Sequence, residues 1–433
     1  MGSIRHRRAV LAVSLALGLG AAAAAQGPAP KWHPPNAPAE APAEATATTP
    51  VVLNARIGEH PDRTRFVIEV SDPLAVRVFT LANPDRVVID MPEVLWRLSG
   101  PEKPTGLGVV KSYRYGLFRP GDSRFVIDLS APATPSQAMI LPPADGLGYR
   151  IVVDLFPVSQ AKFDGGSGWP ADLRVREAQQ DDSLDALIAR TAAQEPARGK
   201  KVIVIDPGHG GIDSGTICSN GTMEKDLVLD EGKRLAKALK SRGYVVHMTR
   251  DSDIFIPLRE RVNISRGYGA DLFISLHADS NPDSTVSGAS IYTLSERGSN
   301  AEAAALAQRE NQSDVVAGVD MKGQDDSVSH ILIDLAQRDT INRSARFAET
   351  AVSRLGAVTD ILPREPHRSA AFVVLKAPDV PAVLIELGYL SNAHDCAQMG
   401  TDRWRDRTAS AIAAAVDSHF APSAPAMASD GTP

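Results

Sequence analysis

The sequence predicts a small all-β sandwich followed by a larger α/β domain, whose sheet is largely parallel or mixed and is flanked by helices. In residues 51–158, short runs of β-branched and apolar residues alternate with Pro, Gly and Asp turns, which is typical of an all-β domain. From Lys200 onward, apolar runs alternate with longer helical segments, as in α/β domains. A chain of 433 residues is too long for one ordinary core, so two domains joined by linkers are expected.

Residues 1–25 are expected to be a signal peptide for export. Arginines precede an apolar run over residues 9–25, and that run ends in alanines, the small residues that cleavage requires. A retained membrane anchor is the alternative, but the run is only just long enough to span a bilayer. The mature protein is therefore expected in a bacterial periplasm. The pair Arg7-Arg8 leaves the choice between the Sec and twin-arginine routes open.

The net charge argues against some classes of binding partner, and the cysteine count does not decide whether the two cysteines form a disulfide. The net charge of −6 gives no general attraction to nucleic acid or to anionic membranes. Two cysteines are too few for a disulfide framework. Cys218 and Cys396 could pair in an oxidising compartment, and the sequence alone does not show whether they meet.

Three segments are expected to connect or follow the domains. Residues 26–50 are rich in Pro and Ala and have little to bury, so we expect a tether. Residues 159–199 are expected to form a polar linker, with a flexible joint at 164–168 and a helical piece at 183–193. Residues 421–433 again hold mostly small residues and Pro, and we expect a disordered tail.

The β-rich region contains two copies of one pattern. Residues 64–73 (TRFVIEVSDP) match residues 123–132 (SRFVIDLSAP), and residues 85–90 (DRVVID) match residues 149–154 (YRIVVD). A duplicated set of β-hairpins predicts two sheets packed face to face. The region has no evident cluster of His, Cys and carboxylate residues, so we expect it to bind or to pack and not to catalyse.

The second domain is expected over residues 200–420. The continuous apolar run at residues 201–205 predicts a strand that is buried on both faces. Further strands are expected at residues 244–248, 272–276, 289–294 and 382–385. Helices are expected at residues 224–242, 258–267, 331–355 and 401–419.

Residues able to bind or use a metal follow three of these strands. The first strand runs into a glycine-rich loop with His209, the third ends at His277, and the last ends at Glu386. Sites in open α/β sheets form at the carboxyl ends of strands, so we expect these side chains to meet, together with Glu224 at the start of the first helix. Each residue alone is a weak signal. Two histidines and a carboxylate, with a fourth position left for water, are the ligands of a catalytic zinc.

The order of these motifs carries a resemblance to a known family. The sequence holds, in turn, Asp206-Pro-Gly-His209-Gly-Gly-x-Asp213-x-Gly215, Glu224, Ser275-x-His277-Ala-Asp279 and Glu386-x-Gly388. The pattern resembles the zinc-dependent N-acetylmuramoyl-L-alanine amidases of the type-3 family. The resemblance implies that His209, Glu224 and His277 bind zinc and that Glu386 is the catalytic carboxylate. The implied reaction is hydrolysis of the amide between the lactyl group of N-acetylmuramic acid and L-alanine of the peptidoglycan stem peptide.

The expected mechanism needs two proton transfers. Zinc lowers the pKa of a bound water to about 7, so a nucleophile is available at neutral pH. Glu386 is expected to take the proton of that water and to deliver it to the L-alanine nitrogen, because an amine anion is a poor leaving group. Asp213 and Asp279 are expected to orient the histidines, to contact substrate or to hold their own loops.

The duplicated strands with Arg-x-Val-Ile-Asp runs resemble the AMIN domain that precedes cell-wall amidases. This resemblance implies binding to peptidoglycan and recruitment to the division septum, with a passive spacer as the alternative. Together, the two domains resemble the cell-division amidases of Gram-negative bacteria, which cleave stem peptides from glycan strands so that daughter cells separate.

An insert of about 40 residues lies between the strand ending near Leu294 and the helix near Leu335, which is more than a simple crossover needs. In the division amidases that the chain resembles, this region carries an inhibitory helix. That helix lends a glutamate to zinc until an activator with a LytM domain displaces it. Glu310, in a helical run at residues 301–310, is the candidate for this glutamate. Glu302 is the competing candidate, and solvated helix positions are the alternative for both.

Three rival functions remain to be compared with the amidase. The first is a catalytically silent, peptidoglycan-binding division protein, against which the presence of all four candidate residues argues. The second is another zinc peptidase acting on stem peptides, but the short-spaced His-Glu-x-x-His and His-x-x-Glu pairs of such enzymes are absent. The third is a glycosidase, whose two carboxylates and no metal would leave His209 and His277 without a role.

Overall fold

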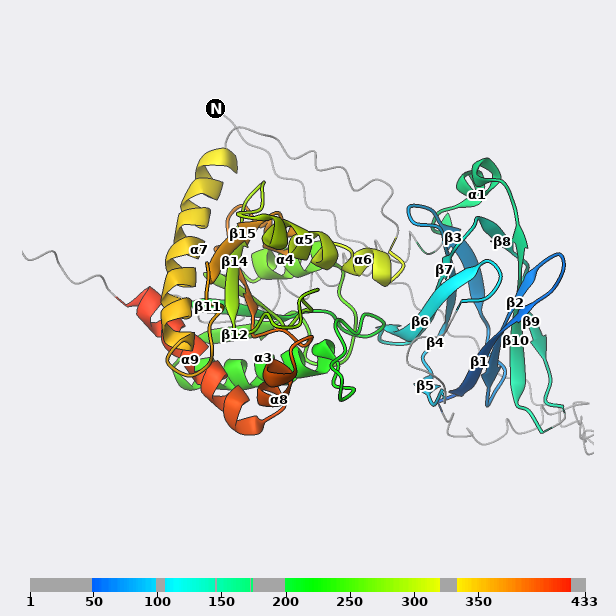
Figure 1. Cartoon of the computed structure of the whole chain (residues 1–433), viewed down its shortest axis with the longest axis horizontal. Coiled ribbons are helices and arrows are strands. Elements are labelled where there is room, and N and C mark those ends of the chain that lie inside the picture. The colour runs from blue at the N-terminus through cyan, green and yellow to red at the C-terminus, as the bar shows by residue number, and fades with distance from the viewer. Residues whose placement is uncertain are drawn as a thin grey trace, which may run out of the picture. The chain divides into compact units, whose positions relative to one another are not determined.

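A computed structural model describes residues 49–98, 106–144, 146–171, 173, 199–319 and 333–421 (Figure 1). The expected signal peptide, nearly all of the Pro/Ala-rich tether, the helical piece at 183–193 and the tail beyond residue 421 lie outside the described residues. Within the described ranges, none of the helices combines the length and the apolar character that a membrane crossing requires.

The first domain is a β-sandwich, as the sequence predicts. One sheet has the order β5-β1-β2-β10-β8, with β9 paired to β10, and the other has the order β3-β4-β7-β6. Side chains from both sheets share one buried core, in which Phe66, Ile127 and Val153 are fully enclosed. The strands are β1 (Val51–Glu59), β2 (Thr64–Val70), β3 (Arg77–Leu81), β4 (Arg86–Pro92), β5 (Leu95–Trp96), β6 (Val110–Arg119), β7 (Asp122–Leu129), β8 (Ala133–Pro135), β9 (Met139–Leu141) and β10 (Tyr149–Pro157).

The duplication in the sequence explains how these strands pair. Strand β2 belongs to the first copy and pairs with β10 of the second, while β4 of the first copy pairs with β7 of the second. The ion pairs repeat as well: Arg65 Nε lies 2.7 Å from Asp154 Oδ1, and Arg124 Nε lies 2.5 Å from Asp90 Oδ1. Each sheet is therefore built around a pair of strands contributed by both copies and joined by an equivalent arginine–aspartate contact.

A short helix lies where the sequence suggested only an irregular linker. Helix α1 (Gln160–Gly166) follows β10, and the Ser159 side chain accepts a hydrogen bond from the Lys162 amide at its start. The ring of Phe163 is 1% exposed and belongs to the core of the sandwich. Burial of this one aromatic side chain stabilises the folded segment, although the polar composition of the segment does not indicate a helix.

The second domain is built on a six-stranded sheet with the order β12-β11-β13-β16-β14-β15. All neighbouring strands run parallel except β14 and β16, so the prediction of a largely parallel or mixed sheet is confirmed. Strand β15 was not expected, because its sequence His-Arg-Ser-Ala lacks an apolar run. The strands are β11 (Val202–Pro207), β12 (Val245–Met248), β13 (Leu272–His277), β14 (Ser290–Leu294), β15 (His367–Ala370) and β16 (Ala382–Glu386).

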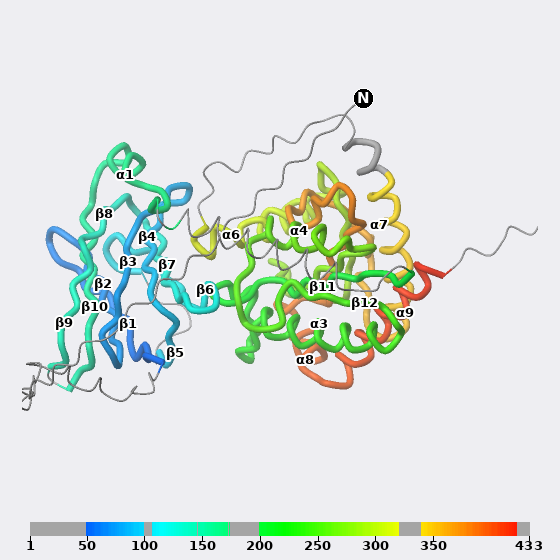
Figure 2. Tube along the Cα trace, turned by 180° about the vertical axis from the view of Figure 1, so that it is seen from behind, coloured from blue at the N-terminus to red at the C-terminus, as the bar shows by residue number. Residues whose placement is uncertain are grey.

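Helices cover both faces of this sheet (Figures 1 and 2). Alternate residues of β11 point to opposite sides, since Ile203 and Ile205 join one core cluster and Val204 joins the other. The first cluster includes side chains of four helices: α3 (Glu224–Ser241), α7 (Ile333–Leu355), α8 (Ala393–Met399) and α9 (Asp402–Phe420). The second cluster includes side chains of helices α4 (Leu258–Gly267) and α5 (Ala301–Glu310) and of the 3-10 turn η1 (Val373–Leu375). A short helix, α6 (Ser313–Val316), follows α5.

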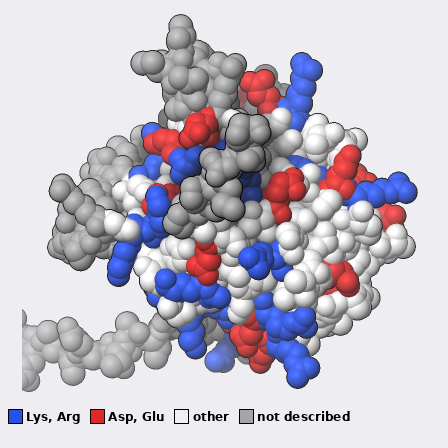
Figure 3. Space-filling view, turned by 90° about the vertical axis from the view of Figure 1, so that its left-hand side faces the viewer, with Lys and Arg blue, Asp and Glu red and all other residues white. Residues whose placement is uncertain are grey.

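Charged side chains of both signs are interspersed over the face drawn in Figure 3, and neither sign dominates it. The face thus matches the modest net charge of −6. It offers no broad basic surface of the kind that nucleic acid requires.

One buried carboxyl makes stability depend on pH. Glu231 of α3 is 0% exposed, and its Oε1 accepts a hydrogen bond of 2.9 Å from Thr408 of α9. Burial raises the pKa of Glu231 from its ordinary 4.5 to about 8. Between these two pH values the unfolded chain releases the proton that the folded chain retains. The free energy of unfolding therefore falls as pH rises, by at most about 1.4 kcal/mol per pH unit.

We expect Glu231→Gln to remove this dependence. Denaturant unfolding at pH 5, 6.5 and 8 should show the variant losing less stability with rising pH than the wild type does. Glutamine keeps an oxygen that can accept from Thr408 but does not ionise. Parallel pH profiles for the two proteins would show that Glu231 is not the titrating group.

Candidate metal centre

The predicted residues meet at the carboxyl edge of the sheet. Strand β13 lies between β11 and β16, and its last residue, His277, is paired in register with Glu386, the last residue of β16. His209 lies two residues beyond the end of β11, and Glu224 is the first residue of α3. Because parallel strands end at one edge, residues far apart in the sequence are brought to one place.

Two histidines and two carboxylates form the centre of the cluster. The Oε1 atom of Glu224 lies 3.1 Å from His209 Nε2 and 3.3 Å from His277 Nδ1. A second carboxylate faces the same nitrogens, since Glu310 Oε2 lies 3.6 Å from His209 Nε2 and 3.0 Å from His277 Nδ1. All four side chains are buried.

The donor atoms suit a zinc ion. His209 Nε2 and His277 Nδ1 are buried without a hydrogen-bond partner, although each faces carboxylate oxygens. One donor atom each from His209, His277 and Glu310 lies within 4.8 Å of the others. Ligands about 2.0–2.1 Å from a tetrahedral zinc are roughly 3.3 Å from one another, which is close to the nitrogen–oxygen separations here. Imidazole and carboxylate are also the ligand types that zinc accepts.

The His209 side chain is held from behind. Its Nδ1 atom lies 2.9 Å from Asp213 Oδ2, and Asp213 Oδ1 accepts a hydrogen bond of 3.1 Å from the Gly215 amide. A histidine whose second nitrogen is held by a carboxylate is fixed in ring orientation, as metal-binding histidines commonly are. Of the roles considered for Asp213, the structure thus supports both orientation of a histidine and stabilisation of its own loop.

Two glycines in this loop leave the space that the ligands occupy. A Cβ atom on Gly208 would lie 2.4 Å from the Cε1 and Nε2 atoms of His277. Gly215 has a φ of 61°, and a Cβ atom there would lie 2.7 Å from Glu224 Oε2 and from His209 Cδ2. The glycine-rich loop is therefore required for close approach between the backbone and the ligand side chains.

Two buried arginines, which the sequence did not reveal, hold the loop after β11. Arg261 donates to Asp206 Oδ1 at 2.8 Å and to the His209 carbonyl at 2.7 Å. Arg250 donates to the carbonyl oxygens of Pro207 at 2.9 Å and Gly208 at 2.8 Å. These cations come from separate segments of the chain, and no local pattern in the sequence marks them as partners of the loop.

Glu224 is fixed by backbone amides on both oxygens. Its Oε1 accepts a hydrogen bond of 2.7 Å from Ala278, and its Oε2 accepts one of 2.9 Å from Thr216. Burial opposes ionisation of Glu224, but the attraction of nearby His209 and His277 outweighs it and holds its pKa well below the ordinary value. Burial likewise opposes charge on His277, and the carboxylates of Glu310 and Glu224 still raise its pKa to about 10.

Glu386 lies beside this cluster and is fully buried. Its Oε2 accepts a hydrogen bond of 3.0 Å from the Asp279 amide, whereas its Oε1 has no hydrogen-bond partner among the described residues. Burial, followed by the repulsion of nearby carboxylates, raises the pKa of Glu386 well above its ordinary value despite the attraction of His277. A carboxyl group in this environment can hold a proton, which is what a general acid and base must do.

None of the hydrogen bonds described for Asp279 involves His209 or His277. Its carboxylate accepts from Thr216 Oγ1 at 3.0 Å and from the Ser280 amide at 2.6 Å, and it pairs with Arg309 of α5 at 2.9 Å. Asp279 therefore links the loop after β13 to α5, and of the expected roles its position fits a structural one.

The sequence matches two family models. Residues 203–418 match the N-acetylmuramoyl-L-alanine amidase model, and residues 54–147 match the AMIN domain model. The chain is 33% identical to the N-acetylmuramoyl-L-alanine amidase AmiC of Escherichia coli over 382 residues, which cover 86% of this chain and 89% of that protein. It is 34% identical to AmiC of Neisseria meningitidis over 392 residues, with 87% and 91% covered. It is 43% identical to the amidase AmiA of Escherichia coli over 223 residues, with 51% and 77% covered.

An AMIN β-sandwich followed by an α/β domain with histidines and glutamates at the carboxyl edge of its sheet defines a cell-wall hydrolase architecture. The chain belongs to the N-acetylmuramoyl-L-alanine amidase family.

We expect Gly208→Ala to weaken zinc binding by about 10–100-fold, the range found when groups that orient metal ligands are altered. The added methyl group would displace the His277 ring without straining the backbone, because Gly208 does not have a positive φ. Competition with a chromophoric chelator measures the affinity. Gly165→Ala is the matched control, since a Cβ atom there meets nothing within 4 Å. Equal affinity of the two variants would contradict the role given to Gly208.

Proposed function

We propose that this protein is a zinc-dependent N-acetylmuramoyl-L-alanine amidase. It hydrolyses the amide between the lactyl group of N-acetylmuramic acid and L-alanine of the peptidoglycan stem peptide. The observation that carries the proposal is the meeting of His209, Glu224 and His277 beside Glu386 at one edge of the sheet. Relatives that share most of the chain's length are named for this activity.

His209, Glu224 and His277 are the proposed metal ligands. Glu224 is held by two backbone amides, His209 is held by the Asp213 carboxylate, and His277 is the last residue of β13. Zinc, when bound, would act as a Lewis acid on the scissile carbonyl and would make a water molecule acidic at neutral pH.

Glu386 is the proposed proton carrier. The Asp279 amide fixes one of its oxygens and leaves Oε1 free of protein partners among the described residues. Glu386 takes a proton from the attacking water and delivers it to the L-alanine nitrogen as the carbon–nitrogen bond breaks. The same carboxyl serves both transfers. Glu386 is paired in register with His277, so its fixed position is next to the proposed metal site, where both transfers occur.

The AMIN sandwich is the proposed wall-binding part of the protein. We propose that the enzyme is exported to the periplasm, binds peptidoglycan through this domain and acts at the division septum in daughter-cell separation. The AMIN match and the similarity to AmiC proteins over nearly their full length support this placement.

Glu310 is the proposed brake on activity. It is the last residue of α5, and its carboxylate approaches the same two histidine nitrogens as Glu224 does. A catalytic zinc keeps one coordination position for water, and Glu310 lies where it would take that position. Glu302, the competing candidate, instead pairs with Arg368 at 2.9 Å. Of the two glutamates, the geometry favours Glu310.

Polar contacts attach α5 at both ends. Glu302 pairs with Arg368 near its start, and Arg309 pairs with Asp279 near its end. The Asn311 side chain bonds the backbone at Ala371 and Val373. The apolar contribution of α5 is small, because Ala303, Leu306 and Ala307 are its buried apolar residues. A helix attached in this way suits displacement by an activator, for which a LytM-domain protein is our proposal.

Mass spectrometry of products from purified peptidoglycan tests the amidase activity. We expect the zinc-loaded full chain to release stem peptides that begin with L-alanine and to leave the glycan strands intact. Glu386→Gln should lower the rate by at least about 100-fold, because it removes the proton carrier. The exposed Glu296→Gln is the matched control. Peptides cleaved at other bonds would favour a different zinc peptidase, and binding without any product would favour a silent wall-binding protein.

The brake is tested by Glu310→Ala. We expect a higher basal rate without any activator, because the position near the histidines becomes free for water. Gln308→Ala, an exposed position on the same helix, controls for the change in helix sequence. If Glu302→Ala raised the rate and Glu310→Ala did not, the assignment of Glu310 would be wrong.

A further inference from the structure

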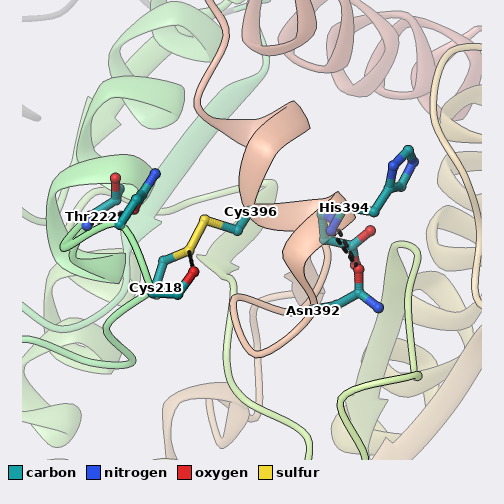
Figure 4. Close-up of a disulfide and its surroundings, with 8 residues drawn as sticks. Cys218, Thr222, Asn392, His394 and Cys396 are labelled. Carbon is teal, nitrogen blue, oxygen red and sulfur yellow. Dashed lines mark hydrogen bonds between the residues drawn. A yellow bond between two sulfur atoms is a disulfide. The ribbon is translucent and has the colours of Figure 1, made fainter.

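A disulfide joins two segments near the metal centre that are remote in sequence. Cys218 and Cys396 are bonded across a separation of 178 residues, with their Cα atoms 6.4 Å apart (Figure 4). The two side chains are 4% and 5% exposed and lie in the same hydrophobic core cluster. The pairing that the sequence left open is thus present in the structure. Cys218 lies six residues before Glu224, and Cys396 lies ten residues after Glu386.

Cys218 belongs to a tight hairpin that leads directly into Glu224. The hairpin is closed by an isolated bridge between Ile217 and Met223 and by a hydrogen bond of 2.9 Å from the Cys218 amide to the Thr222 carbonyl. Met223 is the N-cap residue of α3 and provides no side-chain cap. Without that local cap, the start of α3 depends more on the hairpin for its position.

The same hairpin also holds the Glu224 carboxylate. The Thr216 amide donates to Glu224 Oε2 at 2.9 Å, and the Glu224 amide donates to the Thr216 carbonyl at 2.8 Å. Thr216 is two residues from Cys218. Displacement of this segment would therefore move a hydrogen-bond donor of a proposed zinc ligand.

Cys396 lies in α8, which is attached to the segment that follows Glu386. The carboxylate of the neighbouring Asp395 accepts hydrogen bonds of 2.9 Å from the amides of Tyr389 and Gly288, and one of 2.7 Å from Ser287. Tyr389 is three residues beyond Glu386. Helix α8 therefore holds the backbone just after the proposed catalytic carboxylate.

We propose that the Cys218–Cys396 disulfide is a positioning element for the metal centre. It fixes the hairpin that leads into Glu224 against α8, which holds the backbone just after Glu386, so that the ligand keeps its place relative to the histidines. The inference rests on the proposed role of Glu224 as a zinc ligand. The intact disulfide is then required for tight zinc binding, beyond any contribution to overall stability.

A purely stabilising disulfide predicts a different result. A crosslink across a long loop stabilises a protein mainly by restricting the unfolded chain. Such an effect lowers the melting temperature when the crosslink is lost but leaves the zinc affinity of the folded protein unchanged. Zinc affinity and melting temperature, measured on the same variants, separate the two roles.

The test compares the full chain with its Cys218→Ala/Cys396→Ala variant. Thiol titration of the denatured wild type should find no free cysteine. Zinc affinity is measured by chelator competition at a temperature where both proteins are folded. Ile412→Ala is the control, because it removes a buried side chain from α9 and leaves the disulfide intact. We expect at least about tenfold weaker zinc binding in the double variant and an unchanged affinity in the control at a comparable loss of melting temperature.

Equal zinc affinity in the double variant and in the control would overturn the positioning role. If the double variant does not fold, Cys218→Val/Cys396→Val replaces it, since valine fills more of the buried space left by the sulfur atoms and cannot form the bond. Weaker zinc binding in that variant supports the proposal, and unchanged binding overturns it. A wild type that binds no zinc would instead overturn the proposed function, and the disulfide proposal with it.

Discussion

The contact of Glu224 with His209 and His277 is the interaction on which the rest of this domain's architecture depends. A carboxylate that is 0% exposed is costly unless charge and hydrogen bonds compensate for it. Here the compensation comes from two histidine nitrogens at 3.1 and 3.3 Å and from two backbone amides. Those partners come from two stretches that are remote in sequence, residues 209–216 and 277–278. The sheet order, the glycine-rich loop and the start of α3 must all be correct for them to meet.

The supports around this contact form successive layers. Asp213 fixes the ring of His209, and Arg250 and Arg261 fix the carbonyl groups of the same loop. Asp279 connects Glu386 to α5, because its amide donates to Glu386 and its carboxylate pairs with Arg309. The residues that we propose for catalysis and those that we propose for the brake therefore share one polar network. Displacement of α5 would remove Glu310 from the histidines and Arg309 from Asp279 together.

The two domains differ in how far their sequences predicted them. In the β-sandwich, the duplicated segments identified the central strands, and the alternation of buried residues followed from them. The duplication did not show that β2 pairs with β10 and β4 with β7, because pairing partners depend on packing and not on the repeat itself. In the α/β domain, α4 and α5 were predicted at their observed bounds, since both have a clear helical pattern. Strand β15 was missed, because its residues are polar and it forms through pairing with β14.

The sequence by itself determined which residues could serve a metal centre and where in the fold they would lie. His209, His277 and Glu386 could be placed because strand ends and glycine loops are local features, and parallel strands end at a common edge. Only the tertiary structure placed Glu310 beside the histidines and Glu302 beside Arg368, joined Cys218 to Cys396 and brought Arg250 and Arg261 to the loop. These outcomes depend on the approach of side chains from distant segments. The spacing of residues along a chain records its local conformation but not which remote groups it will meet.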